Sequence, residues 1–76
     1  MKEMLEMIAR ALVDEPQLVI VSEVGGLHTS IIELKVAEAD IGKVIGRQGR
    51  TADALRTLLN AVSAKARKRT VLEIVG

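Results

Sequence analysis

Gly46 and Gly49 divide a long apolar pattern of helical period into two helices. Residues 38–45 fit a short helix, and residues 50–66 fit a longer one. Their apolar positions at helical spacing are Ile41, Val44 and Ile45 in the first helix and Leu55, Leu58, Leu59, Val62 and Ala66 in the second. Glycine has no Cβ atom, so it suits a tight turn and lets the backbone of another molecule approach. The chain is therefore expected to fold around two helices joined by the segment Gly46-Arg47-Gln48-Gly49.

The first 36 residues predict a helix followed by a β-hairpin. Residues 2–13 carry apolar side chains at the spacing of an amphipathic helix, and Pro16 helps to end that helix. Residues 17–24 and residues 29–36 are rich in β-branched side chains and are expected to be strands. Gly25-Gly26 is expected to form the turn between them, because positive φ carries no Cβ penalty at glycine.

A last strand over residues 70–75 completes the order αββααβ. The hairpin pairs two strands antiparallel, and the two-helix crossover is long enough to bring the last strand in parallel. The predicted fold class is α+β: a mixed three-stranded sheet with three helices packed on one face. The other face is expected to be partly apolar, which permits a subunit interface, and to carry Val19, Val21, Glu23, Ile31, Glu33 and Lys35. With 76 residues, the chain is one domain, 1–76.

The composition leaves little material for catalysis or metal binding. There are no cysteines and no aromatic residues of the Phe, Trp or Tyr type, and His28 is the single histidine. Disulfides, thiolate zinc sites and cysteine nucleophiles are excluded, and no acid–base pair or metal cluster is recognisable. We therefore expect no enzyme activity, cofactor, metal or small-molecule substrate. Without a long apolar run or a signal-peptide pattern, we expect no membrane association and a cytoplasmic location.

The small net charge of +1 conceals two halves of opposite sign. Residues 1–42 contain three basic and eight acidic side chains, a net charge of −5, whereas residues 43–76 contain eight basic and two acidic ones, a net charge of +6. This asymmetry indicates one basic surface and a polyanionic partner. A second basic cluster, Lys65-Ala66-Arg67-Lys68-Arg69, follows at the far end of the long helix, where cations already suit the helix dipole.

The glycine segment has the chemistry of a phosphate site. The N–H groups that open the second helix are unpaired and, together with the helix dipole, favour an anion. Lys43, Arg47 and Arg50 surround this point with positive charge, and Gln48 can donate and accept hydrogen bonds. These features suit a phosphodiester better than a free nucleotide.

The segment Lys43-Val44-Ile45-Gly46-Arg47-Gln48-Gly49-Arg50, within the αββααβ order, resembles the signature of the KH-domain family in its type II arrangement. The resemblance covers nearly the whole chain. It implies a groove that holds about four nucleotides of single-stranded RNA. The backbone clamp would be Gly46, Arg47, Gln48 and Gly49, flanked by Lys43 and Arg50, and candidates for the apolar wall of the groove are Ile41, Val44, Ile45, Ala52 and Leu55.

The resemblance also bears on specificity and partners. Ala52 stands where many KH domains place isoleucine, which weakens one apolar base contact. Since no aromatic side chain is present for stacking, low sequence specificity is expected. Small bacterial members of the family imply a homodimer, or a heterodimer with a larger KH-containing protein of the KhpB or Jag type. The implied activity is that of an RNA chaperone or post-transcriptional regulator.

Three other functions fit parts of the sequence. A helix-hairpin-helix DNA binder also presents glycine turns to phosphates, but usually in an all-helical setting. A protein-interaction module would use the partly apolar sheet face, and its polar turn would then have no ligand. A phosphate-handling enzyme would need the G-x-x-x-x-G-K-[ST] spacing of a P-loop, which Gly42-Lys43 lacks.

Overall fold

The computed structural model describes residues 1–76 as three α-helices and three strands, joined in places by 3-10 turns. In chain order they are α1 (Lys2–Leu12), the turn η1 (Pro16–Leu18), β1 (Ile20–Gly25), β2 (Thr29–Lys35), the turn η2 (Glu38–Asp40), α2 (Ile41–Ile45), the turn η3 (Arg47–Gly49), α3 (Arg50–Ala64) and β3 (Arg69–Val75). The predicted α+β class and αββααβ order are confirmed. The ends of elements differ from prediction: η1 delays the first strand, and α3 ends before residue 66.

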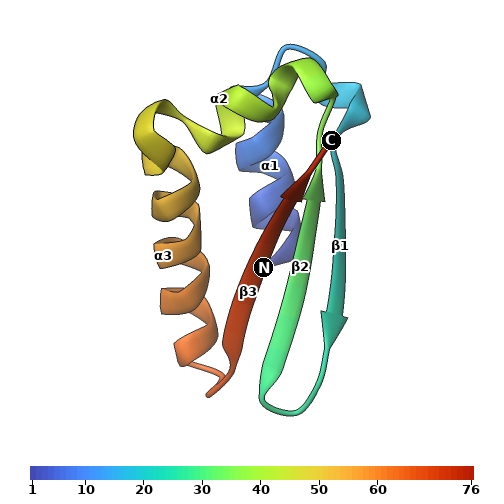
Figure 1. The fold of residues 1–76 in the computed structure, drawn as a ribbon. Coiled ribbons are helices and arrows are strands. Elements are labelled where there is room, and N and C mark those ends of the chain that lie inside the picture. Colours follow the sequence, from blue (N-terminus) through green and yellow to red (C-terminus); the bar gives the residue numbers. More distant parts are fainter.

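The strands form one mixed sheet in the order β1-β2-β3 (Figure 1). β1 and β2 are antiparallel, with Val21 opposite Leu34. β2 and β3 are parallel, with Ile32 opposite Leu72. Two helices separate β2 from β3 along the chain, and such a crossover is what parallel pairing requires. The predicted mixed sheet is therefore confirmed.

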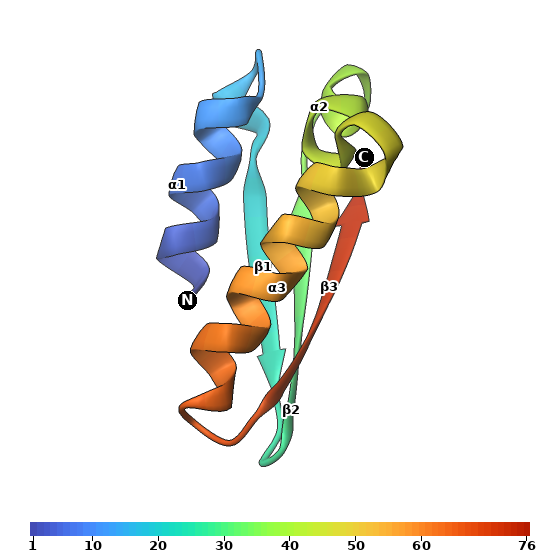
Figure 2. The same ribbon diagram turned by 90° about the vertical axis from the view of Figure 1, so that its left-hand side faces the viewer.

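The helices cover one face of the sheet and enclose the hydrophobic core (Figures 1 and 2). α1 packs against β1, and α3 packs against β3. α2 crosses the end of the molecule at which β2 and β3 finish (Figure 1). Ile32, Leu34 and Val36 point into this core as predicted, each with 2% or less of its surface exposed. The core residues from the helices and their connections are Leu5, Ala9, Val13, Val44, Leu55 and Leu59.

The opposite face of the sheet is exposed, and β1 presents other side chains there than predicted. Val19 and Val21 were expected on this face, but they are 4% and 5% exposed and belong to the core. Val21 points inward because it lies opposite the buried Leu34. Successive positions of this strand are apolar, so alternation alone does not tell which side faces the core. The exposed apolar side chains of the outer face are Ile20, Val24, Ile31 and Val71.

The hairpin turn and α3 also differ from expectation in detail. Neither Gly25 nor Gly26 has positive φ, so the turn does not use this freedom of glycine. Gly26 N–H donates a hydrogen bond of 2.8 Å to the carbonyl oxygen of Thr29. In α3, Leu58 and Val62 are 40% and 39% exposed. The face of the helix that packs on the sheet is formed by Ala52, Leu55, Leu59 and Ser63.

Candidate nucleic-acid interface

The backbone between α2 and α3 turns through conformations that favour glycine. Gly46 ends α2 with φ 77° and ψ 172°, and Gly49 precedes α3 with φ 74° and ψ 10°. Gln48 also has positive φ, 58°, in the left-handed region. The turn is closed by a 3.1 Å hydrogen bond that Gly49 N–H donates to the carbonyl oxygen of Gly46. Three of the four residues therefore have positive φ, and only two of the three are glycine.

The two glycines are needed for different reasons. A Cβ atom at Gly46 would lie 2.7 Å from Cβ and 2.9 Å from the backbone nitrogen of Thr51, so no side chain fits there. A Cβ atom at Gly49 would meet nothing within 4 Å. Gly46 is thus required by packing inside the protein. Gly49 is required only by its left-handed conformation, and the space in front of it is open to a ligand.

The N-terminus of α3 faces this open space with its N–H groups uncapped by any side chain. The dipole of this 15-residue helix favours an anion at this point, although Arg50 N–H already donates to the carbonyl oxygen of Arg47. Arg47 and Arg50 on either side are exposed, and neither forms an ion pair. Asp53 in the first turn opposes this potential, although its carboxylate lies 3.6 Å from the guanidinium of Arg56.

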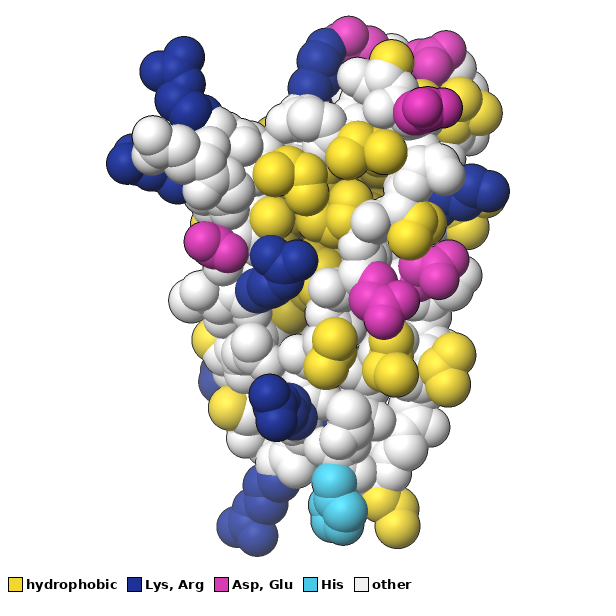
Figure 3. Space-filling view, in the orientation of Figure 1, with side chains coloured by type: hydrophobic (Ala, Val, Ile, Leu, Met, Phe, Trp, Pro, Cys, Tyr) yellow, Lys and Arg dark blue, Asp and Glu magenta, His cyan; other side chains and the backbone are white.

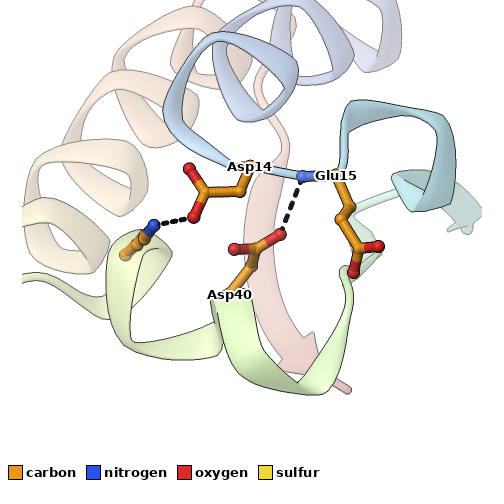
Figure 4. A network of polar contacts seen from close by, with 4 residues as sticks. Asp14, Glu15 and Asp40 are labelled. Carbon is orange, nitrogen blue, oxygen red and sulfur yellow. Dashed lines mark hydrogen bonds and ion pairs between the residues drawn. The ribbon is translucent and has the colours of Figure 1, made fainter.

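Lys43, the third predicted cation, is engaged within the protein. Its ammonium group forms an ion pair with the carboxylate of Asp14, on the connection between α1 and β1 (Figure 4). The hydrogen bond that the Lys43 ammonium donates to the Asp14 carboxylate raises the pKa of Lys43 above its ordinary value of 10.5. Next to this pair, the buried carboxylate of Asp40 accepts a 3.1 Å hydrogen bond from Glu15 N–H. These contacts fasten the connection to α2, and sequence analysis did not foresee them because Asp14 and Lys43 are 29 residues apart.

The structure divides the predicted apolar wall into surface and core. Ile41 and Ile45 on α2 are half-buried, whereas Val44 has no exposed surface. The structure therefore places Val44, one of the predicted contact residues, in the hydrophobic core. Ala52 and Leu55, at 2% and 5% exposure, also belong to the interior. Figure 3 shows an apolar hollow between α3 and β3, below α2.

The second basic cluster lies at the other end of α3. At 1.5 Å per residue, the 15 residues of α3 separate it from the glycine turn by about 22 Å. The helix ends in a Schellman motif, in which Lys68 N–H donates to Ser63 O and Arg67 N–H donates to Ala64 O. Arg67 has φ 56°, a position that glycine usually occupies.

Other site classes find little support in the chain. No group of three or more His, Cys, Asp and Glu side chains is arranged to hold a metal ion. No closed pocket is present. No helix has the length and apolar character needed to cross a bilayer.

Comparison with known proteins agrees with the geometry. The sequence profile of the KhpA/KhpB KH domain matches residues 2–74. The chain is 56% identical over 75 residues to the RNA-binding protein KhpA of Clostridium acetobutylicum, a match that covers 99% of this chain and 100% of the relative. It is 53% identical to KhpA of Caldanaerobacter subterraneus subsp. tengcongensis, again with 99% and 100% covered, and 51% identical to KhpA of Aquifex aeolicus, with 99% and 95% covered. No solved structure gives a significant match. The chain belongs to the KhpA/KhpB family of KH-domain proteins.

Proposed function

We propose that this protein binds single-stranded RNA and clamps the backbone of about four unpaired nucleotides at the turn Gly46–Gly49. The observation that carries the proposal is the open space before Gly49, which adjoins the uncapped N-terminus of α3. A phosphate in this space would accept backbone hydrogen bonds and lie close to Arg47 and Arg50. The names of the KhpA relatives, RNA-binding proteins, agree with this function.

The bases of the bound strand would lie along the apolar hollow beside the turn (Figure 3). We propose that Ile41 and Ile45, which are half-buried on α2, provide apolar contacts to the bases. Since the chain has no aromatic side chain, bases are held without aromatic stacking, which elsewhere contributes about 1–3 kcal/mol per base. We therefore expect weak binding, on the order of micromolar, and little sequence preference. Unpaired RNA should bind more tightly than a duplex of equal length, because only unpaired bases can enter the hollow.

The test is the double variant Arg47→Asp with Gln48→Asp, which places two carboxylates where the phosphate would lie. Both residues are exposed, and aspartate tolerates the left-handed φ of residue 48, so the variant should fold normally. Its control is Arg10→Asp with Ala11→Asp, which changes the net charge by the same amount at exposed positions of another helix, α1. RNA affinity should be lost in the first variant and nearly unchanged in the second. Equal affinities for RNA in all three folded proteins would refute the clamp.

If one domain binds RNA weakly, dimerisation of the protein would increase its affinity for RNA. When two domains hold one RNA strand, the second contact occurs at a high effective concentration, and affinity rises without new contacts at either site. We propose that the protein acts as a homodimer or together with a larger KH-containing partner of the KhpB type. Exposed apolar side chains such as Ile20 and Val24 on the outer face of the sheet are compatible with such association. Analytical ultracentrifugation with and without RNA would determine the oligomeric state.

A further inference from the structure

The connection between α1 and β1 is fastened to α2 at two adjacent points (Figure 4). Asp40, the last residue of η2 and directly before α2, accepts a hydrogen bond from Glu15 N–H and is 2% exposed. This partly buried contact fixes the backbone of the connection, and with it the position of the preceding residue, Asp14. The Asp14 carboxylate then reaches the Lys43 ammonium on the next turn of α2.

The ion pair between Asp14 and Lys43 is accessible to solvent, unlike the contact beside it. The Lys43 side chain is 43% exposed, and that of Asp14 is 74% exposed. An exposed ion pair contributes little to stability, so another anion can replace the carboxylate at small cost. Lys43 lies three residues before Gly46, about one helical turn from the segment that would hold a phosphate.

We infer that Asp14 is a positioning residue for RNA: by holding Lys43, it limits the number of cations that the proposed site offers to the phosphate backbone. The inference rests on the proposed function and deepens it. Arg47 and Arg50 form no ion pair and remain available. Lys43 can bind a phosphate only if its ion pair with Asp14 breaks. The phosphate then replaces the carboxylate as the partner of the ammonium group. Asp14 thus lowers both the affinity for RNA and its dependence on salt.

The first experiment compares Asp14→Asn with the wild-type protein by titration of a short unstructured RNA over a range of salt concentrations. Two available cations predict a slope of log K against log salt of about −1.4 for the wild type. Release of Lys43 should steepen the slope to about −2 and tighten binding roughly two- to fivefold at low salt. Asp14→Glu keeps the charge and should behave like the wild type.

The matched control is Glu6→Gln on α1. It removes one negative charge and breaks an ion pair within α1, the 3.2 Å contact of Glu6 with Arg10. If Glu6→Gln tightens RNA binding as much as Asp14→Asn does, net charge explains the effect and the inference is overturned. Thermal unfolding of each variant shows whether the fold is kept.

A second pair of variants tests the route through Lys43. Lys43→Gln is made in the wild-type protein and in the Asp14→Asn protein, so that the two residues form a double-mutant cycle. In the Asp14→Asn background the same substitution should abolish both the gain in affinity and the steeper slope. A gain that survives without Lys43 would contradict the inference. Failure of the wild-type protein to bind any RNA would instead refute the proposed function, so the two failures are distinguishable.

Discussion

Gly46 lies so close to Thr51 that a Cβ atom at position 46 would stand 2.7 Å from the Cβ atom of Thr51. This contact joins the end of α2 to the first turn of α3. Gly49, three residues later, has no such neighbour. The segment Gly46–Gly49 therefore combines a glycine that shapes the turn with a glycine that leaves space for a ligand.

Alanine substitution should separate these two roles. Gly46→Ala combines a steric clash with a φ/ψ pair that is nearly exclusive to glycine, and should lower the free energy of unfolding by about 3 kcal/mol or more. Gly49→Ala adds only the left-handed conformation, which costs about 1–2 kcal/mol, and should fold while binding RNA less tightly. Urea unfolding followed by RNA titration measures both effects. Equal loss of stability in the two variants would contradict the assigned roles.

A buried hydroxyl group gives a prediction about stability alone. Thr70 is 6% exposed, and its Oγ1 has no hydrogen-bond partner. Because an unsatisfied buried hydroxyl is costly, Thr70→Val should raise the free energy of unfolding by about 1 kcal/mol. Thr29→Val is the control, since Thr29 lies at an exposed position of the adjacent strand and its hydroxyl is accessible to water. Thermal or urea unfolding should show a gain for Thr70→Val only; a loss of stability would indicate a hydrogen bond that forms in solution.

Sequence patterns predicted this fold well wherever one face of an element is polar. In and just after β2, the apolar residues Ile32, Leu34 and Val36 alternate with polar or exposed residues. The side that faces the core was therefore predicted correctly. In β1 successive apolar residues are compatible with either orientation, and only the pairing of Val21 with Leu34 decides between them. The predicted order of elements is correct even though the orientation of β1 was not. The order depends on the hydrophobic period and the glycine positions, not on which side of one strand faces the core.

The candidate site was predictable where it is local in sequence. The turn and its two arginines follow one another along the chain, and the glycine spacing marks them. The distinction between Ile41 and the buried Val44 could not be predicted, since both are apolar and adjacent on one helix face. The contact of Lys43 with Asp14 joins residues 29 positions apart, and no periodic pattern marks such a pair.

The raised pKa of Lys43 predicts how its ion pair responds to alkali. In the unfolded chain the lysine titrates near its ordinary value of 10.5, whereas in the folded protein the hydrogen bond that Lys43 donates to Asp14 raises its pKa. The pair therefore stabilises the fold below pH 10.5, and this contribution is lost as the pH rises through the raised pKa. Urea midpoints of the wild type and of Asp14→Asn should differ by a constant amount from pH 8 to about 10 and converge above that. A difference that persists unchanged at higher pH would show that Asp14 acts on stability without Lys43.

The salt dependence of RNA binding will show how much of the basic half touches RNA. For a single strand the slope of log K against log salt is about −0.7 for each neutralised phosphate. Contacts from Arg47 and Arg50 alone predict a slope of about −1.4. If the cluster at the end of α3 (Lys65, Arg67, Lys68 and Arg69) also contacts the strand, six cations predict a slope of about −4.

Arg67→Gly is the most informative variant for this question, because φ at residue 67 is 56° and glycine adopts this conformation without strain. We expect Arg67→Gly to keep or raise the melting temperature and to leave the slope unchanged. A slope near −4 in the wild type that becomes shallower in Arg67→Gly would extend the RNA path along the whole of α3, and the single site at the glycine turn would then be wrong.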